Sequence, residues 1–149
     1  MYFLTALSTT ELGLNLGKFY TNCTTYEVHP PYFAIGFIDR YKNLKGVAIL
    51  NDYTGSSIEL HLYAPGCFNR KNIKYVFDYV FNKLNCNIFI AKPYRSNKRM
   101  CRLLAKLNKN AYLTTIKQYY GASKDKDAIL YIFDRNFASK WINLDAERT

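Results

Sequence analysis

Apolar residues at helical spacing are clearest between residues 71 and 84. Six of them recur every three or four positions, with polar residues between them: Ile73, Val76, Phe77, Val80, Phe81 and Leu84. Such a stripe is typical of an amphipathic helix packed against a sheet. A second helix is expected to begin near Ser96 or Asn97, both good N-cap residues. Its predicted buried residues are Met100, Leu103, Leu104 and Leu107.

Short runs of apolar, β-branched and aromatic residues predict strands. They lie at 2–7, 32–38, 46–50, 57–63, 87–91, 111–120 and 128–133. The turn residues 51–55 should join two of these strands as a hairpin. After the first strand, Ser8 and Glu11 have the spacing of a capping box and predict a helix start. The expected apolar side of that helix is Leu12, Leu16, Phe19 and Tyr20, and two glycines in it weaken it.

The order of these elements predicts the fold class. A hairpin ladder followed by a strand–helix–strand crossover gives an α/β (α+β) fold with a mixed, mostly antiparallel sheet. We expect about six or seven strands flanked by three or four helices. The 149 residues, 49% of them hydrophobic, are enough for one core, so residues 1–149 are expected to form one domain. Trp141, the single tryptophan, should pack on the body.

The chain carries a formal net charge of +10, which favours anionic partners such as nucleic acid, a membrane surface or a phosphorylated ligand. No apolar run approaches the ~18 residues that span a bilayer, and the N-terminus lacks the pattern of a signal peptide. We therefore expect a cytoplasmic protein without a membrane partner. The four cysteines form no C-x-x-C pair and no cluster with histidine, so packed thiols and no metal site are expected.

The most informative stretch is residues 57–81. A predicted strand ends at Pro65-Gly66 and leads through a basic loop into the start of the long helix. First-turn N–H groups and the helix dipole favour an anion there, and Arg70 and Lys71 would add charged contacts to phosphate. An ordinary exposed helix start with solvated charges is the alternative. A right-handed crossover would bring the second basic helix start, residues 94–102, beside it.

Residues 32–135 resemble the GNAT superfamily of N-acetyltransferases, and more narrowly the small GNAT-type proteins of tailed bacteriophages. The resemblance is carried by ELHLYAPGCFNRKNIKYVFDYVFNKLNCNIFIAKPYRSNKRMCRLLAKLN and by the later ILYIFDR. It implies acetyl-CoA as co-substrate, with its pantetheine arm in a V-shaped opening between the strands at 57–63 and 87–91.

The resemblance also implies residues that bind the cofactor. Backbone groups near Leu62, Tyr63 and Ala64 should pair with the pantetheine amides. The pyrophosphate should lie on the loop of Phe68, Asn69, Arg70, Lys71 and Asn72. Asn97 matches the asparagine that opens the family's second crossover helix. Two departures stand out: the phosphate loop lacks the family's glycines, and Leu104 occupies the place of a tyrosine that protonates the leaving thiolate in many members.

Acyl transfer needs a base for the amine and a donor for the oxyanion, commonly a backbone N–H of the central strand. Glu59 and His61 are the candidate bases, because alternation along the strand puts both on one face. The alternative is that both are partly buried polar residues with ordinary neighbours. Tyr94, Tyr119 and Tyr120 are candidates for the missing acid.

The leading hypothesis is an acyl-CoA-dependent N-acyltransferase that transfers acetyl to a primary amine by direct attack in a ternary complex. The acceptor, a small molecule or a protein, and the oligomeric state stay open, although the basic surface favours an acidic acceptor or partner. The alternative is a catalytically degenerate phage protein of the same fold that binds or inhibits a host or virion protein in the host cytoplasm. Nucleic-acid binding is not favoured, because most aromatic residues fall at core positions.

Overall fold

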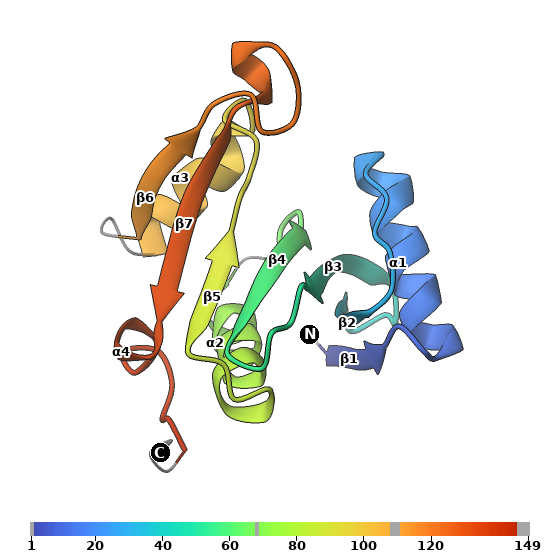
Figure 1. The fold of residues 1–149 in the computed structure, drawn as a ribbon. Helices are drawn as coiled ribbons and strands as arrows, with labels where there is room; N and C mark the ends of the chain where they lie inside the picture. The colour runs from blue at the N-terminus through green and yellow to red at the C-terminus, as the bar shows by residue number, and fades with distance from the viewer. Residues whose placement is uncertain (1, 68, 108–110, 146–149) are drawn as a thin grey trace.

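The computed structural model describes residues 2–67, 69–107 and 111–145. Within them lies a seven-stranded sheet in the order β1-β2-β3-β4-β5-β7-β6. The strands are β1 (Tyr2–Leu7), β2 (Tyr32–Ile38), β3 (Leu44–Asn51), β4 (Ser57–Tyr63), β5 (Ile88–Ala91), β6 (Tyr112–Ile116) and β7 (Ala128–Asp134). Neighbours are antiparallel except β4 and β5, which run side by side in the same direction (Figure 1). The predicted fold class is confirmed.

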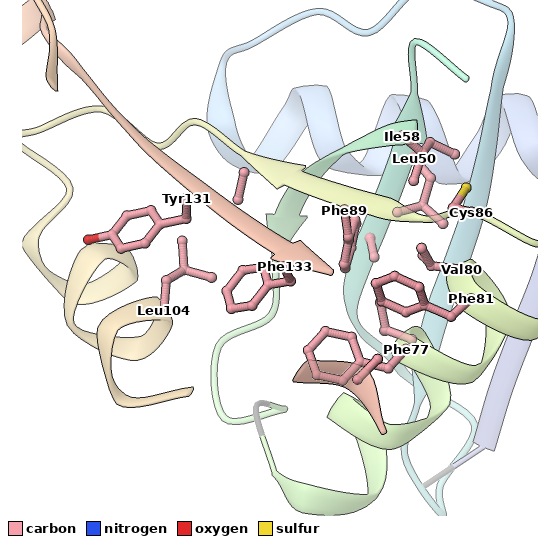
Figure 2. Close-up of a cluster of buried hydrophobic side chains, with 14 of the residues drawn as sticks. Leu50, Ile58, Phe77, Val80, Phe81, Cys86, Phe89, Leu104, Tyr131 and Phe133 are labelled. Carbon is pink, nitrogen blue, oxygen red and sulfur yellow. The ribbon is translucent and has the colours of Figure 1, made fainter. Parts of the chain in front are cut away.

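Helices cover both faces of the sheet. They are α1 (Glu11–Thr24), α2 (Arg70–Asp78), α3 (Lys98–Leu107) and α4 (Arg135–Ala138), and a π-helical turn, Tyr79–Lys83, continues α2. Helix α1 packs on one face through a small core that includes Leu16 and Ile49. Helices α2 and α3 pack on the other face. There the ring centroid of Phe77 lies 6.1 Å from that of Phe89 and 6.0 Å from that of Phe133. Figure 2 shows these side chains among the buried hydrophobic residues.

The start of α1 differs from the predicted capping box. Thr10, not Ser8, is the N-cap, and its hydroxyl accepts from the Gly13 N–H at 3.1 Å. Ser8 instead ties β1 to β2, because its hydroxyl accepts from the Tyr32 N–H at 3.0 Å. Of the residues expected on the apolar side of this helix, Leu16 is buried but Leu12 is exposed.

Gly13 and Gly17 let α1 lie close to its neighbours. A Cβ on Gly13 would collide with the backbone carbonyl of Leu7, and one on Gly17 with the hydroxyl of Tyr32. That hydroxyl donates to the Gly13 carbonyl at 2.8 Å. The two glycines, expected only to weaken the helix, therefore allow its close packing.

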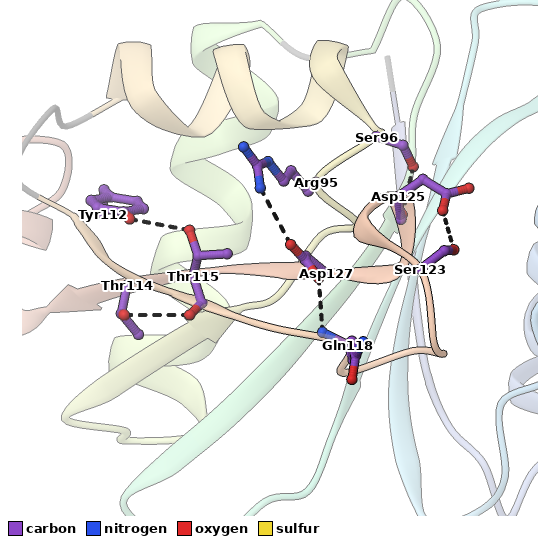
Figure 3. Close-up of polar contacts among 9 residues, drawn as sticks. All are labelled: Arg95, Ser96, Tyr112, Thr114, Thr115, Gln118, Ser123, Asp125 and Asp127. Carbon is purple, nitrogen blue, oxygen red and sulfur yellow. Dashed lines mark hydrogen bonds and ion pairs between the residues drawn. The ribbon is translucent and has the colours of Figure 1, made fainter.

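The strand expected over 111–120 ends at Ile116, and the chain turns back in a loop, residues 117–127, held by a buried carboxylate. Asp127 accepts from the Gln118 N–H at 2.8 Å and from Arg95 at 3.3 Å, as Figure 3 shows. Because Arg95 belongs to the segment after β5, these bonds fasten the loop to the chain leading into α3. The loop thereby brings Tyr119 and Tyr120 against Lys92.

Trp141 packs on the body, as expected. Its ring lies 6.0 Å from that of Phe77, and the Arg70 guanidinium lies 5.2 Å from its centroid. In the part of the chain that the structure describes, no helix combines the length and the hydropathy that crossing a membrane requires.

Candidate functional site

The site begins where β4 and β5 separate. Their pairing ends at Leu60 and Ala91, whereas β4 continues to Tyr63. A cavity of about 270 Å³ occupies the opening. Its walls come from β4, from the segment after β5, from α1 and from α3, and include His61, Lys92, Tyr20, Tyr94, Tyr120 and Asn97. The V-shaped opening expected between these two strands is therefore present.

A second cavity, of about 230 Å³, lies between the end of β4 and the start of α3. Four residues predicted to bind the cofactor line it together: Leu62, Tyr63, Ala64 and Asn97. The Asn97 side chain caps α3 by accepting from the Met100 N–H at 3.2 Å. Arg99, in the first turn of that helix, adds a cation that the sequence reasoning did not single out.

The loop before α2 is organised by two asparagines and one glycine. Asn69 caps the helix, since its side-chain oxygen accepts from the Asn72 N–H at 2.9 Å. The buried Asn72 amide donates to the Cys67 carbonyl at 2.5 Å. Gly66 has φ +70°, a left-handed conformation that glycine adopts at little cost. Phe68, predicted to belong to the phosphate loop, lies outside the described residues.

The side chains of Arg70 and Lys71 extend into a different, open groove. Arg70 stacks on Trp141, and the Lys71 ammonium lies 5.9 Å from the ring centroid of Phe3. Both residues line this groove and neither lines the two cavities beside β4.

Glu59 and His61 lie on one face of β4, the face that α1 covers. A Glu59 carboxylate oxygen is 3.8 Å from Nε2 of His61, and that nitrogen is 3.0 Å from Oδ1 of Asn51. Burial raises the pKa of Glu59; the Lys92 ammonium lowers it and Asp52 nearby raises it. Burial lowers the pKa of His61, which favours the neutral imidazole.

Lys92 is the functional candidate that sequence reasoning missed. Its ammonium lies 3.2 Å from a carboxylate oxygen of Glu59 and donates to the hydroxyl of Tyr119 at 2.7 Å. Its carbonyl accepts from the hydroxyl of Tyr120 at 2.6 Å. Burial alone would lower the pKa of Lys92, but the Tyr119 hydrogen bond and the Glu59 charge outweigh it and raise that pKa. A lysine directly after a short buried strand was the available signal.

Tyrosines surround the opening. Tyr94 and Tyr120 line the 270 Å³ cavity and stack on each other with centroids 4.0 Å apart. Burial raises the pKa of Tyr120 well above its usual value and that of Tyr20 to about 12, so both phenols stay protonated at neutral pH. Leu104, in the place of the family's tyrosine, is buried in the cavity wall.

A third cavity, of about 600 Å³, lies on the far side of His61. It shares Glu27, Val28 and His61 with the first cavity and adds Asp52 and Tyr53. Among the described residues that line the 270 Å³ and 600 Å³ cavities, Lys92 is the sole lysine or arginine. The residues described contain no group of three or more His, Cys, Asp or Glu side chains able to hold a metal ion.

Comparison of the sequence with protein-family models and with curated proteins gives no match. Solved structures do resemble the chain. Mutant forms of the spermidine/spermine N-acetyltransferase SpeG from Vibrio cholerae match with a TM-score of 0.70 at 16% identity, over 93% of this chain and 98% of theirs. The Vibrio cholerae spermidine N-acetyltransferase in complex with CoA and spermine matches with a TM-score of 0.65 at 15% identity, over 92% and 98%.

A protein from Acinetobacter baylyi, proposed to be an acetyltransferase, matches with a TM-score of 0.60 at 13% identity. The match covers 91% of this chain and 93% of that one. At these identities the likeness concerns the fold. The chain therefore has the GNAT fold over almost its whole length.

Proposed function

We propose that the chain is an acetyl-CoA-dependent N-acetyltransferase that acetylates a primary amine by direct attack in a ternary complex. The observation that carries the proposal is the buried carboxylate of Glu59 beside the opening between β4 and β5, with an alkylammonium group already against it. A site that holds the Lys92 ammonium in this way has the polarity to hold the amine of a substrate.

In the proposed reaction, Glu59 takes a proton from the substrate ammonium, directly or through water. The amine nitrogen attacks the thioester carbonyl, the C–N bond forms and the C–S bond breaks. A backbone N–H of β4 beyond Leu60, where pairing with β5 has ended, is available to the oxyanion. The CoA thiolate then takes a proton from Tyr120 or Tyr94, whose hydroxyls replace the missing tyrosine of α3. The second proton that the nitrogen loses as the amide forms restores the tyrosine. His61, kept neutral by burial, positions Glu59 or relays its proton.

For the cofactor, we propose that pantetheine runs along Leu62, Tyr63 and Ala64 through the 230 Å³ cavity. The pyrophosphate would meet the first turn of α2, capped by Asn69, and the guanidinium of Arg99, which lines that cavity. Contacts from Arg70 and Lys71 would require their side chains to leave Trp141 and Phe3. The side chain of Asn97 would hold α3 in place rather than bind phosphate, because it caps the helix.

We propose a cationic amine as acceptor. Glu27, Asp52 and Glu59 lie at or near the 270 and 600 Å³ cavities, so the charge around them is negative although the chain as a whole is basic. The rings of Tyr20 and Tyr53, which line these cavities, add favourable positions for a cation. The similar Vibrio cholerae enzyme was solved with spermine, and spermidine is therefore the first acceptor to test.

The second candidate is a binding protein of bacteriophage origin, acting in the host cytoplasm with a degenerate CoA site. Two observations favour it: Lys92 already occupies the carboxylate of Glu59, and the side chains of Arg70 and Lys71 are engaged with aromatic rings. This candidate predicts no measurable acetyl-CoA affinity in a folded protein.

Calorimetric titration with acetyl-CoA, followed by a CoA-release assay with spermidine, separates the two candidates. Micromolar binding and spermidine-dependent CoA release that falls in a Glu59→Gln variant would support the acetyltransferase. A folded protein that neither binds acetyl-CoA nor releases CoA would contradict it and favour the binding protein.

A further inference from the structure

Lys92 places a primary amine inside the proposed reaction cavity. It directly follows Ala91, the last residue of β5, and lines the opening between β4 and β5. Its side chain is 18% exposed, and its nitrogen is 3.2 Å from the carboxylate of Glu59, the proposed base. An acetyl group delivered through that opening would therefore meet the Lys92 nitrogen as well as any bound acceptor.

The nitrogen is held in place by more than its ion pair. It donates to the Tyr119 hydroxyl at 2.7 Å and lies 4.6 Å from the centroid of that ring. Tyr119 is in turn fixed by the loop that Asp127 ties to the body. A tethered and oriented nucleophile reacts with an effective concentration far above that of a free amine.

Among the residues that the structure describes, no other lysine lines this cavity. Lys45 is the closest comparison, because it also pairs with a carboxylate, that of Asp39 at 3.9 Å. Its side chain is 52% exposed, and it does not line the cavity. Simple chemical acetylation by acetyl-CoA would favour such exposed lysines over Lys92.

From this geometry we infer that Lys92 is itself an acetyl acceptor of the site when no amine substrate is bound, an inference that rests on the proposed function. Glu59 takes one proton from the Lys92 ammonium, and the free nitrogen attacks the thioester carbonyl. The N–C bond forms and the C–S bond breaks. As the amide forms, the nitrogen loses its second proton, and the departing thiolate takes up this proton to leave as CoA. The product is Nε-acetyl-lysine at position 92, which has lost the positive charge that pairs with Glu59.

The test uses the full chain and isotope-labelled acetyl-CoA without added amine, with peptide mass spectrometry to follow each lysine over time. Labelled acetyl should appear at Lys92 at least about tenfold faster than at Lys45. The Glu59→Gln variant should slow labelling of Lys92 by about 10²-fold and leave Lys45 unchanged. Asp39→Asn, the matched removal of the other lysine's carboxylate, should change neither rate. Unlabelled acetyl already on Lys92 after expression, and absent from Glu59→Gln, counts as the same result.

Added spermidine should slow labelling of Lys92 by competition. If spermidine is acetylated while Lys92 is labelled no faster than Lys45, the inference is wrong and the proposed function stands. Equal labelling of Lys92 in the wild type and in Glu59→Gln also overturns it, provided that the variant keeps its thermal unfolding temperature and acetyl-CoA affinity. If acetyl-CoA neither binds nor releases CoA, and Lys92 stays unlabelled, the inference and the proposed function fail together.

Discussion

The ammonium of Lys92 lies 3.2 Å from a carboxylate oxygen of Glu59, and the two side chains are only 18% and 10% exposed. The two groups perturb each other: burial raises the pKa of Glu59 while Lys92 opposes the rise, and Glu59 together with Tyr119 raises the pKa of Lys92. The pair thus keeps a charged carboxylate in a position where burial alone would favour the neutral acid. Stability and reactivity of the site both depend on it.

Replacing Lys92 with methionine should destabilise the fold by about 2 to 4 kcal/mol at neutral pH, because it leaves a buried carboxylate without its cation. The pKa of Glu59 is already raised in the folded state, so its contribution to stability is greatest below the ordinary glutamate pKa and is lost as pH rises through the folded value. Removing Lys92 raises that pKa further. The deficit of the variant should therefore shrink on acidification, as urea unfolding at several pH values would show.

Lys45→Met is the matched control for that experiment. Its ion pair with Asp39 is longer, at 3.9 Å, and its side chain is half exposed, so its loss should cost much less stability than the loss of Lys92. Equal destabilisation by the two substitutions, or a Lys92→Met deficit that does not depend on pH, would contradict the role given to the Glu59–Lys92 pair.

Glu59 and His61 can be separated as bases through the pH dependence of the reaction. If Glu59 is the base, kcat/KM for spermidine rises with pH through a pKa above the ordinary carboxyl range, set by burial and by the neighbouring Lys92 and Asp52. Glu59→Gln should lower kcat by about 10²-fold. His61→Gln should keep the acidic limb, because the His61 pKa is lowered and the ring is neutral at working pH. Loss of that limb in His61→Gln alone would assign the base to His61.

Local patterns were enough to predict the elements and part of the site. Alternation along β4 placed Glu59 and His61 on one face, and Asn97, one of the two N-caps expected for α3, caps that helix because its side chain accepts from the Met100 N–H. These properties depend on residues two or three positions apart. The capping box predicted at Ser8 was wrong, because the Ser8 hydroxyl bonds to Tyr32, a residue distant in sequence that local spacing does not reveal.

The rest of the site depends on contacts between distant segments. Lys92 gained its importance from Glu59 on the neighbouring strand and from Tyr119 on a loop whose position is set by the buried Asp127. Its place directly after a short strand is the one local signal in the sequence, and that signal reveals neither Glu59 nor Tyr119 as a partner. The sequence likewise did not reveal that the guanidinium of Arg70 stacks on Trp141, because Trp141 follows 71 residues later. Arg70 was therefore assigned to the phosphate.

Phosphate binding should depend more on Arg99 than on Arg70. Arg99 lines the 230 Å³ cavity beside β4, whereas Arg70 faces Trp141. We expect Arg99→Ala to weaken acetyl-CoA binding about tenfold, the loss of one charged contact, and Arg70→Ala to weaken it less than about threefold. Calorimetry gives both affinities.

Fluorescence of the single tryptophan gives an independent check, because recruitment of Arg70 to phosphate would remove its contact with Trp141 and change the emission on adding acetyl-CoA. A large emission change with a large loss in Arg70→Ala would reverse the assignment.

Gly46 offers a test of the backbone that should pair with pantetheine. A Cβ at this position of β3 would lie 2.7 Å from the Tyr63 carbonyl oxygen and 2.8 Å from the Ala64 Cα, and backbone atoms cannot yield as a side chain does. Gly46→Ala should therefore push the end of β4 outward, weaken acetyl-CoA binding by tenfold or more, and cost about 1 to 3 kcal/mol of stability.

Gly36→Ala is the matched control, because the new Cβ would meet only the side-chain ends of Leu16 and Leu44, at 3.0 and 3.1 Å. These side chains can adjust, and the three atoms nearest to the new Cβ all belong to these two leucines rather than to the backbone of Tyr63 or Ala64, so this variant should keep the wild-type acetyl-CoA affinity. Thermal unfolding and calorimetry on both variants separate a general loss of stability from a local displacement of β4. If Gly46→Ala binds acetyl-CoA as tightly as the wild type, pantetheine does not rest on the backbone of Tyr63 and Ala64. If both variants lose affinity in proportion to their lost stability, the effect of Gly46 is not specific to the end of β4.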